Sequence, residues 1–354
     1  MSNNLRTYLK DPLLWQMYQQ IRTAGAVRSI SLDLTHRCNI RCTGCYYFEE
    51  GMDKYRSPKE EKLFDEFLLK EKERGTNFIT IVGGEPSLEI GRIKKIYDQF
   101  NLSVATNGIK KIPVEGLENL PIGVAVWGNP KTDKFLRGGG KIDVFGKALK
   151  NYKNDSRAFW YYTVSPGHDH EIASVVEQCI DNGNKVLFNY YSDLTGLGGE
   201  YDYQNGFEKV RAEIDVMIER YPGMILMSPY FNKVISTGRL YDMQWGYEVC
   251  TNVSTNLESN EDRMANGYPY NSHFRAYHAD FETTRRCCTG SDRDCRSCFD
   301  TWEHFSWIMV HLKKHLGSKV EFTNWLSTMY LFYFINRLVD MDTGMELILK
   351  VQNT

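Results

Sequence analysis

The chain lacks an excess of charge of either sign, and it lacks any long apolar run. Its 354 residues include 43 Lys and Arg against 45 Asp and Glu, which leaves a net charge of -2. Such a balance gives no strongly basic surface, so nucleic acid is not an expected partner. Apolar stretches such as 329–335 are far shorter than the roughly 20 residues that span a bilayer, so no membrane span is expected.

The first 20 residues also lack the apolar core and the small-residue cleavage site of a secretory signal. We therefore expect a cytoplasmic, reducing location. There the nine cysteines would serve as metal ligands or core residues rather than as disulfides. Internal repeats and low-complexity stretches are not evident. With 42% hydrophobic residues, the chain is long enough for one large α/β domain with additions, or for two domains.

What the chain does have is a regular alternation of apolar runs and helical segments. Near-continuous apolar runs predict buried strands at 29–35, 78–84, 101–108, 122–128, 158–165 and 185–193, with 224–231 as a seventh candidate. Helical or partly helical segments follow each of the six. The first of these helices is expected at 57–75, with Ser57 as its N-cap. This order predicts an α/β fold with a parallel sheet, either doubly wound or curled into a barrel.

Four regions follow from this pattern. Residues 1–28 form a helical extension, 29–240 carry the strand–helix repeats, 241–300 are rich in cysteine and polar residues, and 301–354 contain two further helices. The region 241–300 has few apolar residues to bury. We therefore expect it to depend on a metal or on the main domain for its structure.

Polar residues follow the strands, and they share one edge of the predicted sheet. In parallel α/β folds this carboxyl-end edge carries the ligand site. The candidate site residues here are Cys38, Cys42 and Cys45 after the first strand, Gly83, Gly84, Glu85 and Pro86 after the second, Thr106 and Asn107 after the third, Ser165 after the fifth and Asn189 after the sixth. His168 and His170 lie in the loop after the fifth strand, either as substrate contacts or as surface residues at a helix start.

Three cysteines in a C-x3-C-x2-C loop leave two readings open. Structural zinc takes four ligands, so Cys38, Cys42 and Cys45 would need His36 or a distant residue to complete the site. A cubic iron–sulfur cluster has four irons, so three cysteines would leave one iron open to an exogenous chelator.

The cysteine loop and the Gly-Gly-Glu-Pro segment after the second strand together resemble the radical S-adenosylmethionine superfamily. The resemblance covers about residues 29–230 and implies a partial (βα)6 TIM-like barrel. It implies that Cys38, Cys42 and Cys45 hold a [4Fe-4S] cluster. It also implies that S-adenosylmethionine binds the open iron and is cleaved to a 5′-deoxyadenosyl radical, which abstracts a substrate hydrogen.

The resemblance further assigns residues to the cofactor. The segment Gly83 to Pro86 matches the one that receives the methionyl amino group, since glycines permit close approach and a carboxylate suits an ammonium. Thr106, Asn107, Ser165 and Asn189 occupy strand ends that could contact the cofactor or simply cap turns. The chain departs from the family at Gly44, where most members place an aromatic residue beside the adenine. A glycine there is similar to the hopanoid adenosyl-transferring branch.

A second cysteine group lies in the C-terminal region. Its members are Cys250, Cys287, Cys288, Cys295 and Cys298. Many members of the resembled family carry auxiliary iron–sulfur clusters in such extensions. Structural zinc and the absence of any metal remain the alternatives.

The expected function is therefore a radical S-adenosylmethionine enzyme that modifies a small molecule or a peptide, with a flavodoxin- or ferredoxin-type protein as the electron donor. Two alternatives stay open. One is transfer of the adenosyl group to an alkene, and the other is a non-catalytic zinc scaffold or sensor.

Overall fold

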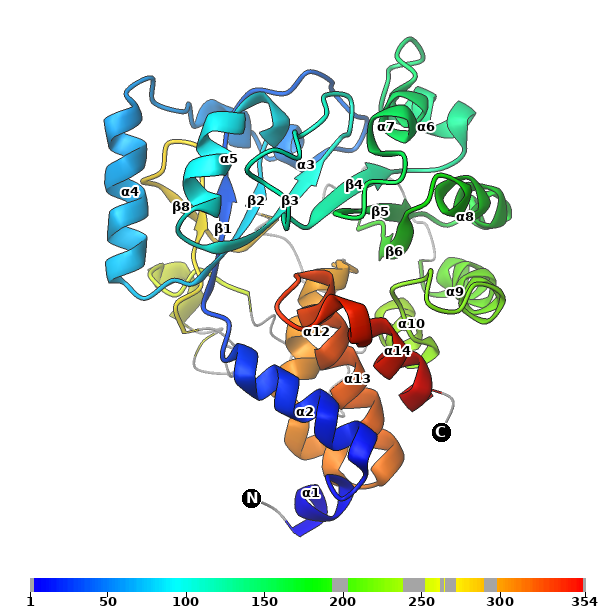
Figure 1. The fold of residues 1–354 in the computed structure, drawn as a ribbon. Helices are drawn as coiled ribbons and strands as arrows, with labels where there is room; N and C mark the ends of the chain where they lie inside the picture. The colour runs from blue at the N-terminus through cyan, green and yellow to red at the C-terminus, as the bar shows by residue number, and fades with distance from the viewer. Residues whose placement is uncertain are drawn as a thin grey trace.

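A curved sheet of eight strands organises the molecule, as the computed structural model shows (Figure 1). The structure describes residues 3–192, 203–237, 252–261, 264, 272–289 and 298–352. The strand order is β6-β5-β4-β3-β2-β1-β7-β8. Six strands pair in parallel: β1 (Ser29–Asp33), β2 (Phe78–Val82), β3 (Asn101–Thr106), β4 (Ile122–Val126), β5 (Ala158–Val164) and β6 (Lys185–Tyr190). The predicted parallel α/β sheet and partial barrel are confirmed, and each strand ends where its polar loop begins.

Two short strands from the cysteine-rich region extend this sheet beyond β1. Strand β7 (Ala276–Tyr277) runs parallel to β1, and β8 (Thr284–Arg285) runs antiparallel to β7. The Ser31 N–H donates to the Arg275 carbonyl at 2.9 Å. The cysteine-rich region is thus anchored on the main sheet by backbone pairing, which the sequence pattern did not reveal because these strands are only two residues long.

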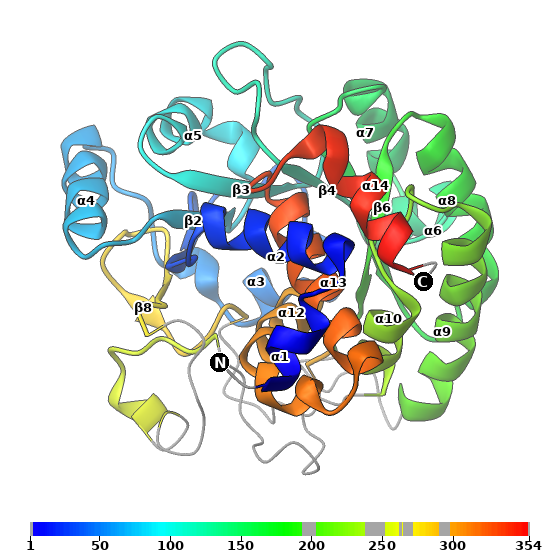
Figure 2. The same ribbon diagram turned by 60° about the horizontal axis from the view of Figure 1, so that its bottom comes forward.

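Helices cover the convex face of the sheet. They are α4 (Glu61–Glu73), α5 (Ile90–Tyr97), α6 (Pro130–Leu136), α7 (Val144–Tyr152), α8 (Ile172–Asp181) and α9 (Tyr203–Arg220) (Figures 1 and 2). Alternate residues of each strand point at them, as the two-residue strand period requires. Trp160 on β5 meets Phe145 on α7 at 5.3 Å between ring centroids, and Tyr190 on β6 meets Phe207 on α9 at 4.9 Å.

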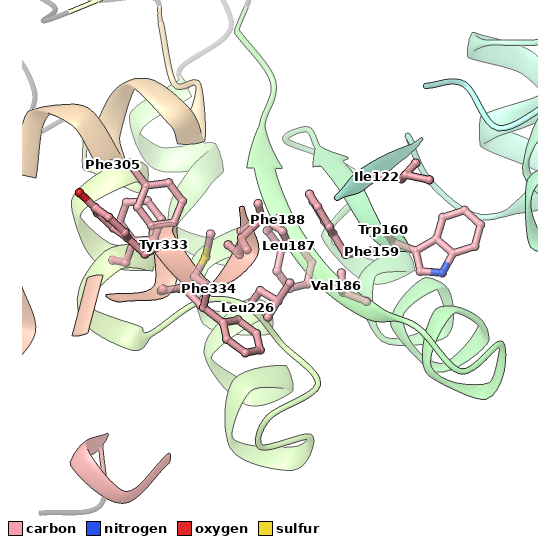
Figure 3. Packing of buried hydrophobic residues seen from close by; sticks show 14 of the residues in the cluster. Ile122, Phe159, Trp160, Val186, Leu187, Phe188, Leu226, Phe305, Tyr333 and Phe334 are labelled. Atoms are coloured by element: carbon pink, nitrogen blue, oxygen red, sulfur yellow. The ribbon is translucent and has the colours of Figure 1, made fainter. Parts of the chain in front are cut away.

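The C-terminal helices fill the concave face. Helices α12 (Thr301–Val310) and α13 (Lys319–Ile335) lie at the centre of the ring of strands and helices in Figure 2. Tyr161, which points opposite to Trp160, meets Trp302 on α12 at 6.2 Å. Phe305 packs on Phe231 of α10 (Pro229–Ser236) at 4.1 Å. Figure 3 shows this continuous apolar packing from Phe305 and Tyr333 to Phe188 and Trp160. A curved sheet needs such a filling because its inner face is also apolar.

The N-terminal helices pack on the same C-terminal group. Helices α1 (Asn3–Tyr8) and α2 (Pro12–Ala24) lie against α13, and α14 (Met341–Gln352) packs beside them. The Tyr330 hydroxyl donates to the Gln20 side chain at 2.6 Å, and the Tyr333 hydroxyl donates to the Gly25 carbonyl at 2.8 Å. No helix of the described residues is long and apolar enough to cross a membrane.

Three local predictions were wrong or incomplete. The segment 224–231 is not a strand: Ile225 makes one bridge to Val186, and α10 begins at Pro229, capped by the Ser228 hydroxyl. Helix α4 begins at Glu61, so Ser57 is not its N-cap. Helices α6 and α14 were not predicted. The sequence of α6 does carry a start signal, since Asn129 caps it and Pro130 occupies its first position.

The buried histidine of α12 makes the fold sensitive to acid. The His304 Nδ1 contacts the Asp300 carbonyl at 2.7 Å, so Nδ1 is the protonated nitrogen. Its Nε2 is buried without a hydrogen-bond partner among the described residues. Burial lowers the pKa of His304 from 6.5 to about 4. The unfolded state then binds more protons between these two values, and stability is lost as the pH falls through this window.

We expect His304→Asn to remove this acid sensitivity, because an amide can keep the donated hydrogen bond but does not titrate. Between pH 7 and pH 4 the wild type should lose about 3 kcal/mol of unfolding free energy more than the variant does. Urea unfolding of both proteins at pH 7, 5.5 and 4 measures this difference. Parallel losses in the two proteins would contradict the assignment.

Candidate functional site

The three cysteines of the first loop share one neighbourhood at the carboxyl end of β1. Cys38, Cys42 and Cys45 are each half-buried. The thiols lie close enough together that neighbouring cysteines help to raise the pKa of Cys38 and of Cys42. Burial raises the pKa of Cys38 to about 11 and that of Cys42 to about 12, and it raises the pKa of Cys45 as well. In the absence of a bound cation the thiols are therefore neutral at pH 7. A cationic group that binds here must displace their protons.

The Gly83-Gly84-Glu85 segment clamps the cysteine loop. The Gly84 N–H donates to the Thr35 carbonyl at 2.9 Å, and the Glu85 N–H donates to the Arg37 carbonyl at 2.8 Å. A Cβ on Gly84 would lie 2.1 Å from the Arg37 carbonyl oxygen. Gly83 has a φ of +109°, and its Cβ would meet Asp33 at 2.9 Å. The close approach that the two glycines permit is therefore, first of all, an approach to the cysteine loop itself.

The Glu85 carboxylate ties the second strand end to the third. It is 1% exposed and accepts hydrogen bonds from the Thr106 hydroxyl at 2.6 Å, the Asn107 N–H at 2.8 Å and the Ser87 N–H at 2.9 Å. Pro86 is buried and begins a short 3-10 helix. Thr106 and Asn107 thus lie beside Glu85, as their strand-end positions predicted, but the hydrogen bonds that their side chains make are to other protein groups. Their contact with a cofactor stays a prediction.

The Asn107 side chain continues this network to the cysteines. Its Nδ2 donates to the Asn39 Oδ1 at 2.6 Å, directly beside Cys38. The two neighbouring loops therefore fix each other through one amide pair, and this pair orients the backbone that carries Cys38.

Arg137 is a site residue that the sequence reasoning missed. Its buried guanidinium pairs with Asp133 at 3.0 Å, donates to the Ala125 carbonyl at 2.7 Å, and hydrogen-bonds the Cys42 side chain. It comes from the end of α6, the helix that was not predicted. A cation at this position favours the thiolate form of Cys42. The i,i+4 spacing of Asp133 and Arg137 on a capped helix was the available signal.

Gly44 and Tyr191 meet across the site. Gly44 has a φ of +72°, and a Cβ there would lie 3.0 Å from the Tyr191 hydroxyl at the end of β6. A larger residue at position 44 would be strained in its backbone and crowded by this tyrosine. The aromatic ring that the cysteine loop lacks is thus present beside the loop, from another strand.

Other predicted residues have structural partners. The His36 Nδ1 accepts from the Ser57 N–H at 3.0 Å, and burial lowers the pKa of His36, so the ring is neutral. The Asn189 Oδ1 accepts from the Thr301 N–H at 2.9 Å and so holds the start of α12. Ser165 is half-buried, and its carbonyl accepts from the His168 N–H at 3.2 Å.

Part of the second cysteine group lies at this same edge of the sheet. The Cys288 thiol donates to the Glu303 Oε1 at 2.6 Å, and its pKa is raised by a hydrogen bond with Cys287 and by burial. Cys298 is buried close to Cys287 and Glu303. Cys288 also lies close enough to Tyr46, the residue after Cys45, to help raise the pKa of that tyrosine. This part of the cysteine-rich region therefore faces the cysteine loop.

The donor set bears on which metal the site can take. Cys250 and Cys295 lie outside the described residues. Among the residues that are described, no group of three or more His, Cys, Asp or Glu is arranged to hold a metal ion. A single zinc ion needs all its ligands about 2.0–2.3 Å away, whereas a cluster distributes its cysteines over several irons. Three thiols on one clamped loop, with Arg137 nearby, fit a cluster in their chemistry. A second cluster stays a prediction.

The comparisons with known proteins agree with this geometry. Residues 32–191 match the family described as the Radical SAM superfamily. A probable GTP 3′,8-cyclase of Saccharolobus solfataricus is 27% identical over 144 residues, which cover 38% of this chain and 45% of that protein. An uncharacterized protein of Archaeoglobus fulgidus is 26% identical over 207 residues, 56% of this chain and 50% of that protein. The chain spans about half the length of these curated relatives.

One solved structure shows the same fold. The histidine-tagged form of anSMEcpe with bound AdoMet has a TM-score of 0.50 and 16% sequence identity, and the match covers 83% of each chain. At this identity the likeness concerns the fold.

The glycine clamp predicts a selective effect of one methyl group. Gly84→Ala places a Cβ against the Arg37 carbonyl, so the two loops must separate; we expect a loss of about 1–3 kcal/mol in stability. Gly91→Ala is the matched control, because nothing lies within 4 Å of its Cβ. Thermal unfolding, with iron content after anaerobic reconstitution, measures both effects. Equal behaviour of the two variants would show that the clamp is not rigid.

Proposed function

Because this chain belongs to the radical SAM superfamily, we propose that it cleaves S-adenosylmethionine reductively at a [4Fe-4S] cluster held by Cys38, Cys42 and Cys45 and abstracts a hydrogen atom from its substrate. When bound, the cluster supplies the electron that splits S-adenosylmethionine into methionine and a 5′-deoxyadenosyl radical. The observation that carries this proposal is the clamped cysteine loop at the carboxyl edge of the parallel sheet.

The residues around the loop have distinct roles in this proposal. Arg137 favours the thiolate form of Cys42, which the surrounding burial opposes. The Glu85 carboxylate has about four acceptor positions, and Thr106, Asn107 and Ser87 occupy three of them. The remaining position, with the buried negative charge, suits the methionyl ammonium. Gly83, Gly84 and Pro86 hold that carboxylate beside the loop.

Asn189 and Ser165 mark the other side of the proposed cofactor site. Asn189 lies on the concave side of β6, where its Oδ1 holds the start of α12. Ser165 ends β5 next to it in the sheet. We expect them to border the ribose or the carboxylate of the cofactor.

The substrate space is proposed to lie between the cysteine loop and the C-terminal helices. The Tyr161 hydroxyl on the concave face donates to the Asp300 carboxylate at 3.4 Å, and Asp300, Tyr46 and Cys288 lie close enough to help burial raise the pKa of Tyr161. These groups converge from the sheet, the cysteine loop and the cysteine-rich region. A small molecule or a peptide that entered here would meet thiol, carboxyl and phenol groups in one space. The nucleotide named in the GTP 3′,8-cyclase relatives is not assigned to this chain, because the match covers less than half of the Saccharolobus protein.

Tyr191 is proposed as the aromatic neighbour of the adenine. It stands against Gly44, the position that other members fill with an aromatic residue, while the positive φ of Gly44 disfavours a side chain there. Stacking on an aromatic ring stabilises such a contact by about 0.5–1.5 kcal/mol. The phenol ring, rather than its hydroxyl, carries this interaction.

The first test is cluster assembly and cofactor cleavage. Anaerobic reconstitution with iron and sulfide should give a brown protein that forms 5′-deoxyadenosine from S-adenosylmethionine with dithionite. Single Ala substitutions of Cys38, Cys42 or Cys45 should lower product formation at least about a hundredfold, since each removes one ligand of the cluster. Cys179→Ala is the matched control, because this buried thiol belongs to α8.

The outcomes separate the competing functions. A colourless protein that binds only zinc would refute the proposal. Adenosine mass retained in the product, without free 5′-deoxyadenosine, would favour adenosyl transfer over hydrogen abstraction.

The second test concerns the adenine contact. Tyr191→Ala should weaken binding of S-adenosylmethionine to the reconstituted protein about threefold to tenfold, because the stacking surface is lost. Tyr191→Phe keeps the ring and should bind as the wild type does. Isothermal titration under anaerobic conditions measures both affinities. If the Phe variant were as weak as the Ala variant, the hydroxyl rather than the ring would be the group that matters.

A further inference from the structure

A hollow of about 670 Å³ lies on the outer rim of the sheet, between α6 and the loop after β5. Its lining includes Lys131, Lys134, Phe135, Leu136, His168 and His170. The residues that line the hollow come from α6 and from the loops after β4 and β5, and they include none of the cysteine loop or of the C-terminal helices. The proposed reaction gives these residues no role.

The rim of this hollow carries positive charge. Lys131 is exposed and Lys134 is half-exposed. Two of the acidic groups nearby, Asp133 and Glu171, are buried. Asp133 is buried against Arg137, and Glu171 is buried and accepts from the Thr132 hydroxyl at 2.6 Å. A partner that approaches this rim meets the two lysines and the two histidines, beside the buried Glu171 carboxylate that also lines the hollow and the half-exposed Asp169.

An exposed aromatic ring stands within this basic rim. Phe135 is 69% exposed, whereas Asp133 on the same helix is buried. His168 and His170 add two stacked rings, with centroids 6.3 Å apart and planes at 24°. Aromatic residues, Phe among them, are enriched in protein–protein interfaces, so Phe135 offers an anchor within this basic rim.

Two bonds connect this hollow to the cysteine loop. The Leu136 carbonyl, in the lining of the hollow, accepts from the Thr43 N–H at 2.8 Å. The next residue, Arg137, hydrogen-bonds the Cys42 side chain. Thr43 itself is exposed and lies between Cys42 and Cys45 in the sequence. The end of α6 thus links a docking-type surface to the proposed cluster ligands by single hydrogen bonds.

We propose that this hollow is the docking surface of an acidic one-electron donor of the flavodoxin type. The proposal rests on the proposed function, which requires an electron at Cys38, Cys42 and Cys45. In the docked complex the donor flavin passes from hydroquinone anion to neutral semiquinone and transfers one electron to the cluster, so the step balances without a proton. The lysines attract the acidic donor, and Phe135 fixes its position.

The charge pattern suits a transient electron-transfer partner. Redox complexes bury little surface, typically below about 1,200 Å². Their association depends on complementary charge, which raises the encounter rate and is screened by salt. A short path from the surface to the acceptor then matters more than a large interface, and the end of α6 offers that path.

The test compares a protein donor with a chemical one. We expect the double variant Lys131→Glu and Lys134→Glu to raise the KM for reduced flavodoxin and its Kd about tenfold, with the salt dependence reduced. Phe135→Ala should weaken binding about threefold to tenfold. The reconstituted holoenzyme is used throughout. Flavodoxin binding by titration and cluster reduction by stopped-flow absorbance are followed in addition to 5′-deoxyadenosine formation.

Two controls make the result specific. Lys70→Glu with Lys72→Glu changes the net charge equally on exposed positions of α4, at the opposite end of the sheet (Figure 1). Leu69→Ala removes another exposed apolar side chain, which is 56% exposed. Both controls should behave as the wild type does.

The chemical donor separates this inference from the proposed function. All variants should retain dithionite-driven cleavage. Absence of dithionite-driven cleavage in the wild type would refute the proposed function. Dithionite cleavage with unchanged flavodoxin binding in the charge variants would overturn the docking surface. Loss of substrate turnover with both donors would also overturn it, because the hollow would then bind the substrate.

Discussion

The contact of two loop backbones is the constraint on which the site depends. The segment after β2 hydrogen-bonds the cysteine loop through the Gly84 and Glu85 N–H groups, and no room exists for a Cβ at Gly84. Buried backbone groups must be paired, so this pairing fixes a loop that would otherwise have no regular structure. Glu85 then fastens the end of β3 to the same unit. Three strand ends thereby form one rigid edge, which a site built on loops requires.

Much of the fold could be predicted from the sequence because the sheet is parallel and covered on both faces. Strands in such sheets are nearly continuous apolar runs, and the six runs from 29–35 to 185–193 correspond to β1 to β6. Helix α6 was not predicted because it is seven residues long and carries polar residues at most positions. The seventh strand was wrong because 224–231 is apolar but contains Pro229, which begins a helix there.

The candidate site could be predicted by position but not by contact. Because Glu85, Thr106 and Asn107 each lie at or just after the end of a parallel strand, they were predicted to lie at one edge of the sheet. The structure places Thr106 and Asn107 within hydrogen-bond distance of Glu85. That their polar atoms bond one another depends on strand register, which a single sequence does not specify. Arg137 shows the limit of prediction from sequence. It lies almost a hundred residues from Cys42 in the chain, so their contact could be recognised only once the fold was known.

Strand β7 has a consequence for how the protein is made. Strand β1, from which the cysteine loop extends, has two neighbours in the sheet. One is β2, which follows about fifty residues later in the chain, and the other is β7, which follows almost 250 residues later. Asp33, at the end of β1, pairs with Arg285 at 2.8 Å. During synthesis the cysteines leave the ribosome long before this partner does. The loop therefore lacks support on one side until residues 276–285 have also emerged, and the site is complete only then.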